Sequence, residues 1–281
     1  MENHQRFPFR FFVITFLWSW LVWLPLVLAG SGKMPLIQRF VDNARLPLTV
    51  LGAFGPAAGA CFSLRTLAGR GAVRQYLRSL LDFRFGWQAW ILPVLALGGG
   101  TCVAWALPEL WGASRLGVLL PSLWVFPLYL LLMMSFGGGQ EELGWRGFIL
   151  DPIEARLGPL LGNLLFGVVW AVWHLPLFFI PGTSQAFMSF PAFMLLTTGY
   201  SWFFSWVRHA SGKRTMAGLY VHGLANAFVP VFPTLVMKAD APQPRFWIFA
   251  GVMFVVGLAT TTLRLRHGQV QHSAHPSMSG G

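Results

Sequence analysis

Residues 140–147, QEELGWRG, place two adjacent carboxylates and an arginine beside long apolar runs. An ionisable group at membrane depth costs about 3 kcal/mol or more, so it is first considered as part of a functional site. Glu142 and Arg146 are spaced i, i+4 and can pair on a helix. Glu141 lies about 100° around that helix, so it need not share this partner and can remain available for chemistry. The alternative is a salt bridge at a helix end near the bilayer surface.

A histidine stands among aromatic residues further along the chain. In the apolar stretch 158–180, Asn163, Gly167, Ala171 and His174 follow one another at spacings of four, four and three. On a helix they share one face, which predicts a polar, partly small-residue stripe that faces other helices rather than lipid. Taken alone, His174 can equally be a core histidine satisfied by one hydrogen bond.

A second histidine is followed one helical turn later by an amide. His222 and Asn226 are spaced i, i+4, so both side chains point to the same side of a helix. A neutral imidazole or an amide can donate hydrogen bonds to a developing oxyanion. For this pair alone, polar contacts between membrane helices are an equally good interpretation.

Together, these residues provide a carboxylate base, two imidazoles and an amide donor on three separate segments. If they converge, they can activate water against a carbonyl group. Glu141, His174 and His222 would also serve as the three ligands of a catalytic zinc ion, and the residues leave both uses open. The motifs of other intramembrane hydrolases, His-Glu-x-x-His and Gly-x-Ser-Gly, are absent, and no aspartate lies within an expected span.

The surrounding sequence is that of an integral membrane protein, with 55% hydrophobic and only 10% charged residues. Eight apolar stretches approach the roughly 20 residues that a helix needs to cross the bilayer. They are 11–29, 46–64, 87–107, 116–136, 158–180, 187–207, 215–235 and 246–263. We therefore expect an all-α, polytopic membrane protein of about eight transmembrane helices, with a central intramembrane site. Residues 1–266 would form a single transmembrane domain and residues 267–281 a disordered polar tail.

The net charge of +11 suggests a membrane topology rather than a nucleic-acid partner. If the N-terminus is cytoplasmic and all eight stretches span, fourteen lysines and arginines are cytoplasmic and six lie opposite. The positive-inside rule then places both termini in the cytoplasm. The first stretch, preceded by Arg6 and Arg10, could instead be a signal peptide, although it is longer than a usual apolar core. Cys61 and Cys102 lie inside expected helices and predict neither a disulfide nor a metal site.

The three motifs in this order resemble those of the CPBP family, also called the Abi family. It comprises the CAAX prenyl endopeptidases and related bacterial proteins, and the resemblance covers roughly residues 46–235. It implies about eight transmembrane helices around a water-accessible site, in a bacterial inner membrane. It implies Glu141 as the base that activates water, with His174 helping to hold that water. The resemblance further implies His222 and Asn226 as oxyanion donors, with Glu142 and Arg146 in support.

The resemblance also implies a membrane-associated peptide or protein as substrate, in the best-known case with a prenylated C-terminus. Trp170 stands where the second motif usually has Phe, which we interpret as a packing change. The family has been regarded both as metalloproteases and as glutamate-dependent, metal-free peptidases. We favour a metal-free site without a cofactor and keep zinc as the alternative. The competing functions are a non-catalytic immunity or scaffold protein and a proton-coupled transporter.

Overall fold

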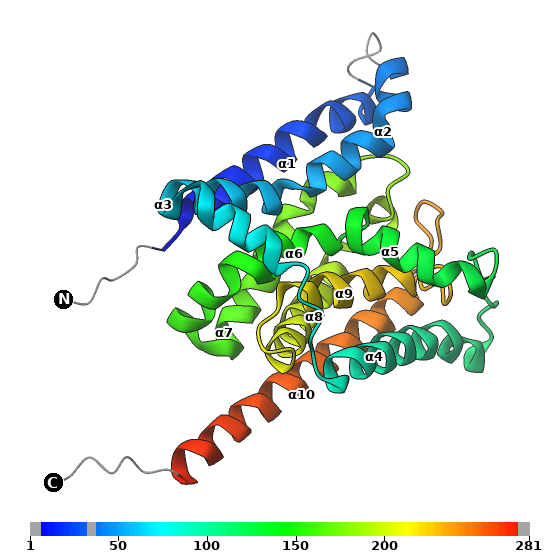
Figure 1. The fold of residues 1–281 in the computed structure, drawn as a ribbon. Helices are drawn as coiled ribbons and strands as arrows, with labels where there is room; N and C mark the ends of the chain where they lie inside the picture. Colours follow the sequence, from blue (N-terminus) through cyan, green and yellow to red (C-terminus); the bar gives the residue numbers. More distant parts are fainter. Residues whose placement is uncertain (1–6, 33–37, 275–281) are drawn as a thin grey trace, which may run out of the picture.

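A computed structural model describes residues 7–32 and 38–274. Within these ranges the chain consists of helices and connecting turns, without a β-strand (Figure 1). The longer helices are α1 (Phe9–Gly30), α2 (Gln38–Ala53), α3 (Gly55–Ser79), α4 (Trp87–Ala106), α5 (Phe126–Phe136), α7 (Leu150–Trp173), α8 (Phe190–Ala210), α9 (Thr215–Ala227) and α10 (Pro244–Ala274).

Four helical segments of the described chain are long and apolar enough to cross a membrane: Phe9–Gly30, Trp87–Trp111, Leu123–Phe179 and Pro244–Arg266. A bent pair of helices, broken by 41° between α2 and α3, provides a fifth if the pair forms one span. Helices α5 and α9 have only 11 and 13 residues. At about 1.5 Å per residue, neither crosses about 30 Å of hydrocarbon alone. The all-α, multi-pass membrane fold is therefore confirmed, whereas a count of eight spans is not.

Proline interrupts three of the expected spans. The stretch 46–64 breaks just before Pro56, which lies in the first turn of α3 and has no N–H for a preceding helical turn. The stretch 116–136 becomes helical only after Pro121. The stretch 215–235 ends its helix at Ala227, shortly before two further prolines. The apolar character was predicted correctly, but the continuous helices were not.

The C-terminal boundary also differs from the expectation. Helix α10 continues to Ala274, beyond the expected domain end at residue 266. No proline stands between Arg266 and Ala274, so nothing in the sequence forces the helix to stop earlier. The remainder of the expected disordered tail, residues 275–281, lies outside the described residues.

Glycines let the helices of the second half approach closely. Helix α8 packs against both α7 and α10. A Cβ atom added at Gly167 of α7 would meet the backbone of Thr198 on α8, and one added at Gly199 would meet the backbone of Met253 on α10. Small residues at such crossings are typical of membrane helix packing. This part of the fold therefore holds α7, the helix that carries His174, in a fixed position.

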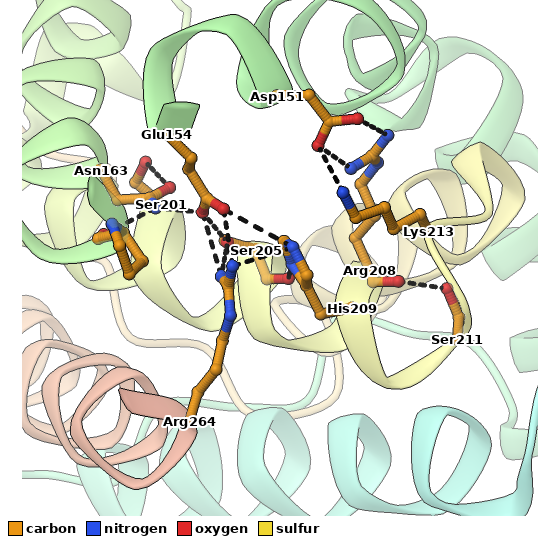
Figure 2. Close-up of polar contacts among 11 residues, drawn as sticks. Asp151, Glu154, Asn163, Ser201, Ser205, Arg208, His209, Ser211, Lys213 and Arg264 are labelled. Atoms are coloured by element: carbon orange, nitrogen blue, oxygen red, sulfur yellow. Dashed lines mark hydrogen bonds and ion pairs between the residues drawn. The ribbon is translucent and has the colours of Figure 1, made fainter. Parts of the chain in front are cut away.

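A buried polar cluster ties the same three helices together (Figure 2). Glu154 of α7 accepts hydrogen bonds from Asn163 at 2.7 Å, from Ser205 of α8 and from Arg264 of α10 at 2.8 Å. Arg264 also donates to Nε2 of His209 at 2.9 Å. Glu154 thus has protein partners on all three helices, and Asn163, which we expected to face other helices, belongs to this cluster.

A neighbouring ion pair fixes the loop that leads into α9. Arg208 at the end of α8 donates two hydrogen bonds to Asp151, at 2.7 and 3.0 Å (Figure 2). The hydroxyl of Ser211 donates to the carbonyl of Arg208 at 2.7 Å, and the backbone N–H of Arg214 donates to that hydroxyl at 3.2 Å. Helix α9, which carries His222 and Asn226, starts directly after this loop.

Candidate active site

The segment that carries the two glutamates follows a sharp glycine turn. Helix α5 ends at Phe136, and Gly138 has a φ of 124°, which a residue with a Cβ rarely adopts. The side-chain oxygen of Gln140 accepts the N–H of Gly138 at 2.9 Å and closes the turn. Glu141 ends a short 3₁₀ turn, and Glu142 begins the one-turn helix α6 (Glu142–Gly144).

Glu142 and Arg146 form the expected i, i+4 pair. Nη1 of Arg146 donates to Oε1 of Glu142 at 2.8 Å, and both side chains are fully buried. The guanidinium also lies over the rings of Phe166, Trp170 and Phe204, at 4.9, 4.5 and 5.0 Å from their centroids. Stacking of this kind stabilises a desolvated cation.

A π-helical turn, Trp145–Ile149, directs Arg146 inward. Single π-helical turns within α-helices occur frequently at functional sites. Here the turn carries the arginine that pairs with Glu142. The charge of Glu142 is therefore compensated, and its orientation is fixed.

Glu141 is held by different partners. Its side chain is 6% exposed, and its Oε2 accepts the indole N–H of Trp170 at 2.9 Å. Its Oε1 lies 3.8 Å from Nε2 of His174. As expected from the sequence, one carboxylate is tied to the arginine, while its neighbour is not.

The hydrogen bonds of His174 determine which ring nitrogen is free. His174 caps the C-terminus of α7 directly after Trp173, and its Nδ1 lies 2.9 Å from the carbonyl oxygen of Trp170. A carbonyl only accepts, so Nδ1 carries the proton in that bond. In the neutral ring Nε2 is then an acceptor, and it is this nitrogen that faces Glu141.

His222 and Asn226 converge on the glycine turn. Nδ1 of His222 lies 2.8 Å from Oε1 of Glu142, the oxygen that Arg146 also contacts. Asn226 donates one amide N–H to the carbonyl of Gly137. A Cβ added at Gly138 would come within 2.5 Å of Nε2 of His222 and 2.6 Å of Nδ2 of Asn226. The missing side chain of Gly138 therefore leaves space in front of both nitrogens.

The same side chains do not form a metal-binding set. Within residues 7–32 and 38–274, no three His, Cys, Asp or Glu side chains are arranged to hold one ion. Nδ1 of His222 faces Glu142, while Nε2 of His174 faces Glu141. Glu141 and His174 alone lack a third ligand, and we derive no step through zinc.

The structure brings together all six residues singled out in the sequence, and it adds three others. Trp170 was interpreted as a packing residue, but its indole N–H bonds Glu141, so that interpretation was incomplete. Gln140 lies inside the first motif, and only its contact with Gly138 reveals its part in the turn. Tyr76 donates to the carbonyl of Leu143 from the distant helix α3, and no sequence signal indicated that contact.

Part of the chain matches a known protein family. Residues 121–228 match the family described as Type II CAAX prenyl endopeptidase, Rce1-like. All six candidate residues lie inside that segment. This segment is therefore similar to the family that the three motifs indicated.

A curated member of this family is similar over a shorter segment. The chain is 40% identical over 58 residues to CAAX prenyl protease 2 of Methanococcus maripaludis. The aligned segment makes up 21% of this chain and 20% of that relative, so the matched region spans about a fifth of the relative's length. The likeness therefore concerns a segment rather than the whole of either protein.

Proposed function

We propose that this protein is an intramembrane endopeptidase in which Glu141 activates water for hydrolysis of a peptide bond. The observation that carries the proposal is that the two adjacent glutamates have different hydrogen-bond partners. Glu142 is bonded to Arg146 and His222, whereas Oε1 of Glu141 faces Nε2 of His174. A general base needs such a free oxygen within reach of the proton that it takes.

In this proposal, water lies between Glu141 and His174. The 3.8 Å between Oε1 and Nε2 allows one water oxygen to stand about 2.8 Å from each. Both groups accept, so the two hydrogens of the water donate one to each. Glu141 takes its proton as the water oxygen attacks the carbonyl carbon, and later delivers that proton to the leaving amine nitrogen. The net reaction adds one water molecule across the peptide bond and releases a carboxylic acid and an amine.

The oxyanion would be stabilised by the two nitrogens beside Gly138. Asn226 donates one amide N–H to the carbonyl of Gly137, and its second N–H would donate to the oxyanion. Nδ1 of His222 faces the carboxylate of Glu142, so Nε2 donates only when both ring nitrogens carry protons. A charged His222 beside Glu142 fits this role better than the neutral donor considered from the sequence.

Two observations support a substrate class: the name of a similar protein and the apolar surroundings of the site. The name of the Methanococcus relative refers to prenyl proteins, and we propose a membrane-associated, lipidated peptide as substrate here. Glu141, His174 and His222 are buried within an apolar helical domain, and Asn226 is partly buried there. Substrates that partition into the bilayer reach such a site at high local concentration.

Cleavage of membrane-bound peptides by purified protein tests this function. Wild type is compared with Glu141→Gln on a panel that includes prenylated and unmodified peptides in lipid vesicles. We expect Glu141→Gln to lose activity by about 10²–10⁴-fold while still folding, because it removes only the general base.

Glu109→Gln is the matched control, since Glu109 pairs with Arg115 away from the site. It should keep wild-type turnover. Turnover by Glu141→Gln near that of wild type would overturn the role of Glu141. Absence of cleavage by wild type across the panel would favour a non-catalytic scaffold.

A further inference from the structure

Helix α3 changes abruptly from apolar to basic. Residues 55–64 carry no charge, whereas four arginines follow on exposed positions of the same helix: Arg65, Arg70, Arg74 and Arg78. None of the four forms a hydrogen bond or an ion pair with another described residue. The nearest carboxylate along the chain, Asp82, is bonded by Arg84 and Arg214 at 3.0 Å each. The hydrogen bonds from Arg84 hold the pKa of that carboxyl well below its usual range, so Asp82 remains committed to these partners.

A break in α3 brings two of these arginines into one pocket. In a continuous helix, residues five apart point about 140° away from each other. Gly69, between Arg65 and Arg70, has a φ of 80°, which interrupts the helical backbone. Both arginines consequently line an open pocket of about 360 Å³ with Cys61, Phe62 and Val73.

The pocket combines two kinds of wall. Its two guanidinium groups have the planar fork geometry that binds phosphate oxygens in pairs. Phe62, which is 50% exposed, and Val73 provide an apolar side. A free anion gains nothing from contact with apolar side chains. A phospholipid carries both a phosphate for the arginines and acyl chains that can contact the apolar side. The pocket also lies where the apolar stretch of α3 ends and its basic residues begin, which is the kind of boundary where lipid headgroups contact a membrane protein.

We propose that the pocket formed by Cys61, Phe62, Arg65, Arg70 and Val73 binds the phosphate of an anionic phospholipid. The arginines hold the phosphate oxygens, and the first part of an acyl chain lies on Phe62. Arg74 and Arg78 lie outside the pocket and contribute only general attraction to an anionic surface.

The arm of α3 beyond the break is also joined to the candidate active site. The hydroxyl of Tyr76 donates to the carbonyl of Leu143, the residue directly after Glu142. A Cβ added at Gly147 would collide with that same hydroxyl oxygen, so the two segments are in close contact. A lipid that fixes this arm would therefore also fix the segment bearing the two glutamates. This second step, activation by the lipid, rests on the proposed peptidase function.

Binding is tested with the full chain in nanodiscs of phosphatidylcholine containing a titrated fraction of phosphatidylglycerol, with retained lipid counted by native mass spectrometry. We expect the double variant Arg65→Gln/Arg70→Gln to retain phosphatidylglycerol about tenfold more weakly than wild type, since it loses charged hydrogen bonds. The matched double variant Arg74→Gln/Arg78→Gln removes the same charge from the same helix and should remain close to wild type. Equal losses in both variants would overturn the pocket. Full competition by soluble glycerol phosphate would show that a free phosphate, and not a lipid, is bound.

Coupling is tested with Tyr76→Phe, which keeps the ring and removes the donor to Leu143. We expect this variant to bind phosphatidylglycerol like wild type but to lose the increase in cleavage that the lipid gives wild type. Thermal melts confirm that the variant is folded. Cleavage by wild type that is insensitive to phosphatidylglycerol would overturn the coupling. Failure of the proposed peptidase function would leave the binding measurement intact, so the two outcomes are distinguishable.

Discussion

At the scale of single residues, the site depends on which atoms are already occupied. The two glutamates are adjacent in sequence, yet each has its own partners, with Arg146 and His222 on Glu142 and with Trp170 on Glu141. One oxygen of Glu141 is oriented by the indole, and the other faces His174. A base that is oriented but not neutralised by a cation is what water activation requires.

Trp170→Phe tests the orientation of Glu141. It removes one hydrogen bond to a carboxylate, of a kind worth about 1.5–3 kcal/mol, and retains a ring over Arg146. We expect kcat to fall about tenfold with KM unchanged, measured by peptide cleavage in vesicles. Trp173→Phe is the control, because its indole N–H bonds Ser19 instead. An unchanged kcat would mean that Glu141 is oriented without the indole.

Chelator treatment tests the metal-free interpretation of the same atoms. We expect the purified protein to contain less than one zinc per chain and to keep its activity, because no three His, Cys, Asp or Glu side chains of the described residues are arranged to hold one ion. Elemental analysis and cleavage before and after chelation provide the measurement. One zinc per chain, with activity lost on chelation and restored by zinc alone, would reassign Glu141, His174 and His222 as ligands.

At the scale of elements, short irregular segments position the candidate catalytic residues. The glycine turn, the one-turn helix α6 and the π-helical turn Trp145–Ile149 follow one another within a dozen residues. Long helices hold them in place: α7 provides Trp170 and His174, and α9 provides His222 and Asn226. The cluster around Glu154 fixes α7 to α8 and α10, so the candidate residues on α7 are held by three joined helices.

Arg146→Ala tests the connection between this segment and the frame. It leaves Glu142 buried without its cation, and breaking a buried ion pair from one side costs about 3–5 kcal/mol. We expect a lower melting temperature in detergent as well as lost activity. Arg84→Ala is the control, because its pair with Asp82 is exposed and solvent screens it, so its loss should leave the melting temperature nearly unchanged. Equal melting temperatures for wild type and Arg146→Ala would show that the pair does not stabilise the fold.

At the scale of the whole molecule, the helices form a membrane domain of unequal spans. Helix α1 packs against α3, and its Trp20 donates to the carbonyl of Trp173 at the end of α7. Short helices such as α5 and α9 lie against each other. Reactive polar groups can be buried in such a domain because neighbouring helices provide their partners.

Reporter fusions at Met1 and Gly281 test the topology. We propose that both termini are cytoplasmic, since the expected arrangement places fourteen basic residues on that side and six opposite. Both fusions should report the cytoplasm in intact cells. A terminus on the opposite side would mean that the number of crossings is odd or that the orientation is reversed, and a fusion after α4 would then locate the difference.

The sequence by itself determined the membrane class, the six candidate residues and the Glu142–Arg146 pair, because apolar content and i, i+4 spacing are local properties. It did not determine where helices break, since proline effects depend on the packing that accommodates them. Only the tertiary structure decided that Trp170 bonds Glu141 and that His222 bonds Glu142 through Nδ1. It alone brought Tyr76 to Leu143. These contacts join residues far apart in the chain, and their geometry is set by how the helices cross rather than by any spacing along the sequence.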